Sequence, residues 1–99
     1  MLTYIDPPSV SINPSQSPYK VGVGDSLVLY CSASGLPIPK VQWYKNNSRI
    51  NSRPPEFILV PTRPPHTAVY TCVATNNAGN MTHTDHKNIT VIVQGSKFK

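Results

Sequence analysis

Short stretches in which apolar and polar residues alternate recur along this chain, separated by Pro, Gly and Asn. In residues 26–32 the alternation places Leu27, Leu29 and Cys31 on one face. Successive side chains of a β-strand point to opposite sides, so a period of two is typical of a strand with one buried face. A second stretch, 67–75, has its own inward set: Ala68, Tyr70, Cys72 and Ala74. Both stretches are therefore predicted to be half-buried strands.

The remaining apolar stretches are also short, and they predict further strands. They lie at residues 10–12, 19–23, 41–45, 56–60 and 81–93. Because eleven Pro and five Gly are distributed among these stretches, long helices have nowhere to form. About seven short strands with turns at roughly 8–12-residue intervals predict an all-β fold, an antiparallel sandwich of two sheets.

The two cysteines, Cys31 and Cys72, both lie on predicted inward faces. An even number of cysteines in a chain rich in Asn, Ser, Thr and Pro fits a disulfide formed in an oxidising compartment. Trp43 follows the first cysteine by twelve residues, and Tyr70 precedes the second by two. A disulfide between two sheets, a Trp packed on it and a Tyr two residues before the second Cys mark immunoglobulin domains. The chain therefore resembles the immunoglobulin superfamily, most closely its intermediate set.

The resemblance implies an immunoglobulin-like sandwich over residues 7–93 with one disulfide between the sheets. Residues 1–6 are interpreted as a linker or an expression start, and residues 94–99 as a linker or tail. The family's core signature is expected at four positions: Leu29, Trp43, Leu59 and Tyr70.

Two features depart from the family pattern. His66 stands six residues before the second cysteine, where the family usually carries Asp, so neighbouring prolines are expected to stiffen this corner instead. The Tyr70 hydroxyl is expected to bond a backbone group in the segment 61–66. Only 29 positions separate Trp43 from Cys72, which is too few for the extra central strands of a variable domain. The strands in this interval are therefore predicted to be brief or fused.

Charge is sparse, at 13% of residues, and the net charge is +5. The basic residues are scattered, with one candidate patch: Lys45, Arg49, Arg53 and Arg63. Such a patch would suit heparan sulfate, anionic lipid or an acidic protein, and ordinary solubility charge is the alternative. No apolar run approaches the roughly 20 residues of a membrane-spanning helix.

Three triplets match the acceptor pattern for N-glycosylation, at Asn46, Asn80 and Asn88. Asn46 and Asn80 fall in predicted turns, and Asn88 is expected to point outward from the last strand. Together with a disulfide, these sequons favour an extracellular location within a secreted or cell-surface protein.

The sequence lacks the patterns that an enzyme would need. A hydrolase requires a nucleophile, a base and an orienting group, yet the chain has neither a nucleophile elbow nor a phosphate-binding glycine loop. On a strand, His83 and Asp85 share one face and His86 takes the other, so three metal ligands do not converge. Basic residues are not interleaved with aromatics, as nucleic-acid binding would require. A non-catalytic module without metal, cofactor or nucleic-acid partner is predicted.

Recognition of a partner is predicted on one outward sheet face, carried by Gln42, Tyr44, Thr71, Val73 and Thr75. Tyr offers a large, rigid contact area with a polar tip, and the resemblance implies that this sheet is often used for contacts. A simply solvated face is the alternative.

Three functions remain open on this basis. The first is an extracellular recognition module of an adhesion or receptor protein, which binds a protein ligand or a second copy of itself. The second is a structural spacer in a multi-domain or sarcomeric array. The third is a heparan-sulfate-binding module that uses the candidate basic patch.

Overall fold

The computed structural model describes residues 6–62 and 66–94, and this part of the chain folds into eight β-strands in two layers. The strands are β1 (Asp6–Asn13), β2 (Tyr19–Gly22), β3 (Val28–Leu36), β4 (Lys40–Lys45), β5 (Ser48–Ile50), β6 (Phe57–Leu59), β7 (His66–Ala78) and β8 (Met81–Gln94). The predicted all-β, immunoglobulin-like sandwich is confirmed.

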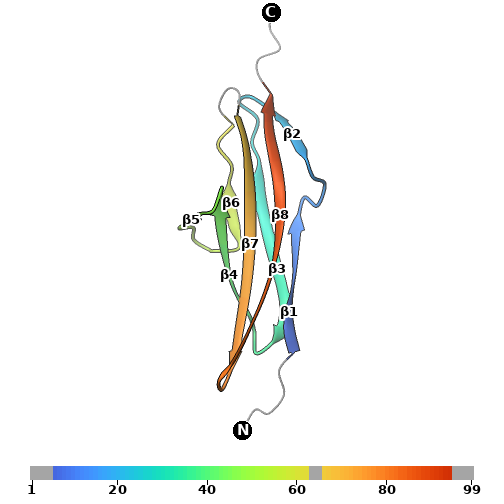
Figure 1. Ribbon diagram of the computed structural model, residues 1–99. Helices are drawn as coiled ribbons and strands as arrows, with labels where there is room; N and C mark the ends of the chain where they lie inside the picture. The colour runs from blue at the N-terminus through green and yellow to red at the C-terminus, as the bar shows by residue number, and fades with distance from the viewer. Residues whose placement is uncertain (1–5, 63–65, 95–99) are drawn as a thin grey trace, which may run out of the picture.

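One layer is a three-stranded sheet in the order β1-β3-β6, and the other is a five-stranded sheet in the order β2-β8-β7-β4-β5. The two long strands β7 and β8 run the length of the molecule (Figure 1). The strand β1 begins at one end of the sandwich, and β8 finishes at the other end. The described residues contain no helix of the length and hydrophobicity that crossing a bilayer requires.

The sandwich was predicted to be antiparallel, and the strand pairs are antiparallel except for β2 with β8, which is parallel. The first part of the chain is divided between the layers, because β1 pairs with β3 in one sheet and β2 pairs with β8 in the other. The connection between β1 and β2 is tied to β8, since the Thr90 backbone N–H donates to the Ser17 hydroxyl over 3.0 Å. Between β1 and β2 the chain thus crosses from one sheet to the other, and the two strands do not form a hairpin.

The core is built from the inward faces that the alternation predicted. Leu29, Cys31, Trp43 and Cys72 are completely buried, and Tyr70 is 1% exposed. The parity of 26–32 and of 67–75 is confirmed, because every predicted inward residue of both stretches is buried.

Leu59 is not a core residue, contrary to its place in the expected signature: it is 72% exposed, whereas Ile58 is 5% exposed. The reason is the strand register. Ile58 lies opposite Leu29, and directly paired residues share a face of the sheet, so Ile58 points inward. Leu59 lies opposite the outward-facing Val28 and therefore points outward. The prediction of the core residue within 56–60 was therefore wrong by one position.

The strands between β4 and β7 are short, as predicted. β5 and β6 have three residues each, and no strand lies between Ile50 and Phe57. The turn from β4 to β5 uses Asn46 and Asn47, whose φ angles are 48° and 71°. Asn tolerates this left-handed region better than most residues, and two such residues suit a tight hairpin turn. The turn directs β5 back along β4.

Candidate functional site

The five residues of the predicted recognition face are brought together by the pairing of β4 with β7. Gln42 lies opposite Val73, and Tyr44 lies opposite Thr71. Thr75 lies opposite Lys40, at the start of β4. All five side chains are half-buried on the side of the sheet away from the core. We call these residues, Gln42, Tyr44, Thr71, Val73 and Thr75, the β4–β7 face.

The Gln42 side chain is fixed by hydrogen bonds to its surroundings. Its Nε2 donates to the backbone carbonyls of Ile50 and Trp43, and its Oε1 accepts from Arg49 Nε over 3.1 Å. Arg49 is also the register partner of Tyr44, so both side chains leave the same side of the sheet. A cation is therefore held beside the tyrosine of the β4–β7 face.

Arg49 was not predicted to belong to this face. The signal that would have placed it there is the Asn46-Asn47 turn, because a two-residue turn puts Tyr44 opposite Arg49 by counting. The face also borders a hollow of about 520 Å³, lined by Tyr44, Arg49 and Val73 together with Glu56 from the loop before β6. An aromatic, a cationic and a carboxylate side chain therefore line the same hollow.

Hydrogen bonding joins the far end of the β4–β7 face to a predicted glycosylation site. Thr71 Oγ1 donates to Asn88 Oδ1 over 2.8 Å, and the exposed Asn88 lies opposite Thr71 in the register of β7 and β8. Asn46 and Asn88 also line one hollow of about 450 Å³. Asn80 is exposed in the turn from β7 to β8. A glycan on Asn88 would stand directly beside Thr71.

The described members of the basic patch do not form one surface. Lys45 follows Tyr44 on β4, so it lies on the opposite side of the sheet from Arg49. Arg53 lines a separate hollow that also includes Phe57 and Leu59 of β6. Arg63 lies outside the described residues. The expectation of a convergent patch is not supported, because proximity in sequence does not place these side chains on a common face.

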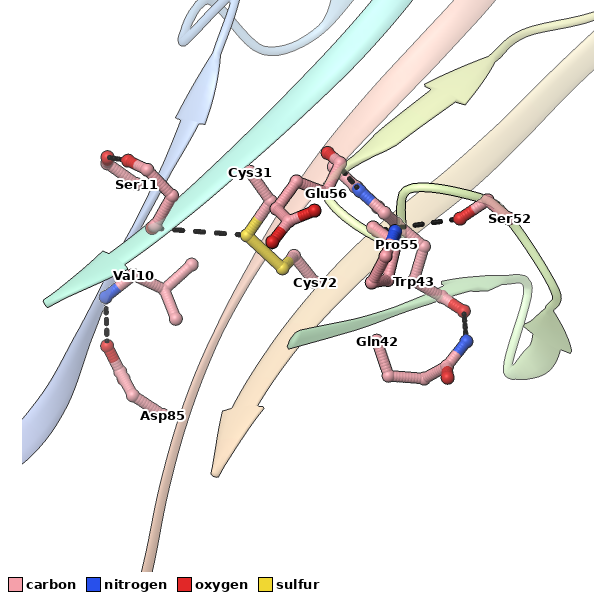
Figure 2. The surroundings of a disulfide bond; sticks show 11 residues. Val10, Ser11, Cys31, Gln42, Trp43, Ser52, Pro55, Glu56, Cys72 and Asp85 are labelled. Carbon is pink, nitrogen blue, oxygen red and sulfur yellow. Dashed lines mark hydrogen bonds between the residues drawn. A yellow bond between two sulfur atoms is a disulfide. The ribbon is translucent and has the colours of Figure 1, made fainter. Parts of the chain in front are cut away.

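The disulfide joins the two sheets between β3 and β7, with 6.5 Å between the Cα atoms of Cys31 and Cys72. Figure 2 shows Trp43 and Glu56 close to it. The Glu56 backbone carbonyl accepts from the Cys31 backbone N–H over 2.9 Å and from Trp43 Nε1 over 3.0 Å. This carbonyl oxygen therefore links β3 to β4. Because it is a backbone atom, the pattern of side chains in the sequence could not predict the link.

Tyr70 is buried against the core, and this burial raises the pKa of its hydroxyl above the ordinary value. Its hydroxyl oxygen is buried and bonds no atom among the described residues. The bond expected for a corner tyrosine therefore stays a prediction, because residues 63–65 and the side chain of His66 lie outside the described part.

The polar stretch of β8 near the β7–β8 turn is used to hold β1. Asp85 Oδ2 accepts from the Val10 backbone N–H over 2.8 Å. His83 is half-buried and His86 is exposed. Among residues 6–62 and 66–94, no three His, Cys, Asp or Glu side chains are placed to hold a metal ion.

Comparison with known proteins places these features in a family. The family model described as "Immunoglobulin domain" matches residues 7–76. Drosophila melanogaster Protein turtle is 34% identical over 86 residues, which is 79% of this chain and 6% of that protein. Human Hemicentin-1 is 34% identical over 91 residues, covering 82% of this chain and 2% of that protein. Human Vascular endothelial growth factor receptor 1 is 32% identical over 92 residues, which is 84% of this chain and 6% of that protein.

These relatives are far longer than the chain, which spans 6% or less of their length. Among solved structures, a chimeric titin Z1Z2 has a TM-score of 0.70 at 20% identity, covering 94% of this chain and 100% of that one. At that identity the likeness shows the fold. The family match, the two-sheet sandwich and the disulfide packed beside Trp43 agree, and the chain belongs to the immunoglobulin domain family.

Proposed function

We propose that this domain is an extracellular recognition module of an adhesion or receptor protein, and that it binds a protein partner through the β4–β7 face. The observation that carries the proposal is the placement of Tyr44 beside Arg49, which is fixed by Gln42. Relatives named as a growth factor receptor and as a neural cell adhesion molecule support the class of parent protein. The disulfide supports an oxidising, extracellular location.

Tyr and Arg are the residue types enriched where protein interfaces gain most of their binding energy. On the β4–β7 face they stand among Thr71, Val73 and Thr75, whose side chains are smaller than that of Tyr44. Gln42 restricts the Arg49 side chain before any partner arrives, so less side-chain entropy is lost on binding. These features suit binding by shape and hydrogen bonding, without catalytic turnover.

The proposal is tested by Tyr44→Ala. A multimeric form of the domain is first used to screen cells that each display one extracellular protein, and affinities for the isolated partner are then measured by surface plasmon resonance. Removing Tyr44 should weaken binding by about 1–3 kcal/mol. The melting temperature should stay nearly unchanged, because Tyr44 lies outside the core.

Tyr30→Ala is the matched control, because Tyr30 is a tyrosine on the outward side of the other sheet. Its replacement should leave the affinity for this partner unchanged. Equal affinity of the wild type and Tyr44→Ala would contradict the proposed face and place the partner site elsewhere on the domain. A screen that finds no partner would favour a structural spacer. Loss of heparin retention in an Arg49→Glu, Arg53→Glu variant would instead support the heparan-sulfate alternative, and retention should then fall steeply with salt.

A further inference from the structure

A hollow on the outward side of the five-stranded sheet is bordered by two predicted glycosylation sites. Its volume is about 450 Å³, and the residues that line it are Asn46, Asn47, Val69, Thr71, His86 and Asn88. We call this set the Val69 hollow. Val69 is its apolar member and is 38% exposed, whereas the other residues have polar side chains. The volume lies in the range of roughly 300–1,000 Å³ that small-ligand sites have, so the hollow has the size of a site for one small molecule.

Asn46 is joined directly to the apolar residue of this hollow. Lys45 pairs with Tyr70, so the next position along the ladder brings Asn46 beside Val69. The Asn46 backbone N–H donates to the Val69 carbonyl over 2.8 Å, and Asn46 Oδ1 accepts from the Val69 backbone N–H over 2.9 Å. The side-chain oxygen thus takes the place that a backbone carbonyl has between paired strands. The direction of the Asn46 side chain is therefore set by its bond to β7.

The atom of Asn46 that would carry a glycan is Nδ2, and neither of these bonds uses it. Asn46 is the acceptor of an exposed sequon that ends at Ser48. Attachment forms one bond, from Nδ2 to C1 of an N-acetylglucosamine, while the bond from C1 to a lipid diphosphate donor breaks and one amide proton leaves. Oδ1 keeps its lone pairs, so its bond to the Val69 N–H is compatible with an attached sugar.

The lining of the Val69 hollow matches the two kinds of surface that a sugar presents. A pyranose ring has C–H groups on its faces and hydroxyl groups around its edge, and N-acetylglucosamine adds an acetamide group. The exposed Val69 side chain offers apolar surface to the ring face or to the acetyl methyl. Thr71, His86 and Asn88 supply hydroxyl, imidazole and amide groups for hydrogen bonds with the edge. One apolar contact with a few polar groups is typical of small-molecule sites.

The other two sequons are less favourably placed for contact with Val69. Asn88 lies opposite Thr71, and its Oδ1 accepts from the Thr71 hydroxyl over 2.8 Å. Val69 lies opposite Thr90, so it is only a diagonal neighbour of Asn88. Asn80 lies in the turn that follows β7, whereas Val69 is near the start of that strand. Asn46 is therefore the sequon residue that lies beside Val69 in the register.

We propose that the first N-acetylglucosamine of a glycan on Asn46 lies in the Val69 hollow and packs on the Val69 side chain. This contact stabilises the domain, because a group that interacts with the folded state alone shifts the folding equilibrium toward it. The glycan also forms one boundary of the β4–β7 face, since Thr71 belongs both to that face and to the hollow. The proposal depends on passage through the secretory pathway, as the proposed function does, but not on the identity of a partner.

The test compares the domain with and without this one sugar. The 99-residue chain is produced in animal cells that make only high-mannose glycans, and endoglycosidase H then trims each glycan to one N-acetylglucosamine. Ser48→Ala removes the Asn46 sequon and leaves the two bonds between Asn46 and Val69 in place. Its melting temperature should be about 3–6 °C below that of the trimmed wild type, which corresponds to one lost contact of methyl size.

Protein made without glycans in the bacterial periplasm separates the sugar from the substitution. In that protein Ser48→Ala should leave the melting temperature unchanged, because Ser48 is exposed. Thr90→Ala removes the Asn88 sequon and is the matched glycan control. Relative to the same variant made without glycans, Thr90→Ala should cost less than half of what Ser48→Ala costs. Equal costs for the two sequons would overturn the proposal, because a general effect of attached sugar would then explain both.

Val69→Thr tests the contact itself. It keeps the branched shape of the side chain and replaces one methyl group by a hydroxyl, so the fold should be retained. In this background the loss of the Asn46 sugar should lower the melting temperature by at most half of the wild-type amount, because both changes remove the same contact. An undiminished effect of the sugar in Val69→Thr would show that the glycan acts without touching Val69, and the proposal would be wrong.

Two further measurements locate the sugar. Peptide mass spectrometry of the secreted wild type should find a glycan on Asn46, and an unmodified Asn46 would overturn the proposal. Nuclear Overhauser effects should connect the acetyl methyl of the Asn46 sugar with the Val69 methyl groups, whereas contacts from a sugar on Asn88 instead would overturn it. The proposed function is tested separately, because Tyr44→Ala should leave the effect of the Asn46 sugar on the melting temperature unchanged.

Discussion

The backbone carbonyl of Glu56 illustrates how single atoms join the two sheets beside the disulfide. It accepts one hydrogen bond from Cys31 and one from the Trp43 indole. Trp43 therefore acts both as the largest completely buried side chain and as a polar tie between β4 and the loop before β6. These two roles are separable by substitution.

Trp43→Phe should lower the free energy of unfolding by about 1–2 kcal/mol, through the lost indole bond and the volume lost from the core. The carbonyl of Glu56 keeps its bond to the Cys31 N–H, which limits the cost. Trp43→Ala should cost about 3–5 kcal/mol, because it leaves a cavity over the disulfide. Urea denaturation of the three proteins measures both effects, and equal losses in the two variants would show that the indole's size contributes nothing.

Tyr70 makes the stability of the domain depend on pH in the alkaline range. Its pKa in the folded state is raised by burial above the ordinary value of 10.0. Below that value both states keep the phenol proton, so the contribution to stability is fully present. As the pH rises, the unfolded chain ionises first, and the folded state is progressively disfavoured until its own pKa is passed.

The fall in unfolding free energy between about pH 8 and about pH 11 should therefore be smaller in Tyr70→Phe than in the wild type. Tyr30→Phe is the control, because Tyr30 is 37% exposed on the outward side of β3. Chemical denaturation at a series of pH values measures the slope. An identical alkaline slope in the wild type and Tyr70→Phe would contradict the assignment to Tyr70.

At the scale of elements, Asn76 ties together three segments that are distant in sequence. Asn76 is 2% exposed on β7, and its Nδ2 donates to the Asp6 carbonyl over 2.9 Å and to the Pro37 carbonyl over 3.0 Å. The start of β1 and the connection from β3 to β4 are thereby held against β7. The close approach is also visible at Gly35, whose φ is +148° and where a Cβ would lie 2.9 Å from the Asp6 carbonyl oxygen.

Asn76→Ala should lower the unfolding free energy by about 1–3 kcal/mol, because two part-buried carbonyls lose their donor. Amide hydrogen exchange should rise first in β1 and in the connection from β3 to β4. Asn77→Ala is the matched control, since Asn77 is exposed and its Oδ1 accepts from Thr82 Oγ1 within its own hairpin. A cost below that of the control would mean that the Asn76 contacts do not hold these segments.

At the scale of the whole molecule, the disulfide closes the chain across the core with a sequence separation of 41. In the chain-entropy account, a loop of this length contributes about 4 kcal/mol by restricting the unfolded state. A domain of this size has only about 5–15 kcal/mol of stability in total, so the bridge is a large part of it.

The double variant Cys31→Ala, Cys72→Ala should accordingly lose about 4 kcal/mol in urea denaturation. The wild-type protein with its disulfide reduced should lose a similar amount, which separates the cross-link from the packing of the sulfur atoms. Wild-type stability in the reduced protein would contradict a stabilising role and weaken the inference of an extracellular setting.

Glycans on the surface of the domain are expected to affect partner binding. We expect glycans at Asn46, Asn80 and Asn88, and a glycan at Asn88 should restrict access to Thr71. Thr90→Ala removes that sequon while leaving the Asn88–Thr71 hydrogen bond in place, so it is a cleaner change than Asn88→Gln. Intact mass should fall by one glycan, and partner binding through the β4–β7 face should strengthen or stay equal. Weaker binding would mean that the glycan itself belongs to the interface.

The sequence by itself determined the parity of the long strands, the cysteine pair and the class of fold. Leu27, Leu29 and Cys31 are buried as their alternation predicted, and so is the inward set of 67–75. These features follow from a period of two and from fixed spacings, which act within one strand and require no knowledge of its neighbours. The outward direction of Gln42 and Tyr44 was predictable for the same reason, because these residues alternate with Trp43.

Only the tertiary structure decided what depends on which strands pair. The register of β3 with β6 buries Ile58 instead of Leu59, and the same register places Leu59 beside Val28 on the outward side of the sheet. The change of sheet between β1 and β2 makes one pairing parallel, and the hairpin of β4 and β5 puts Arg49 beside Tyr44 and away from Lys45. A short strand with apolar residues at every position fits either parity equally well, so its partner across the sheet decides which side chains reach the core.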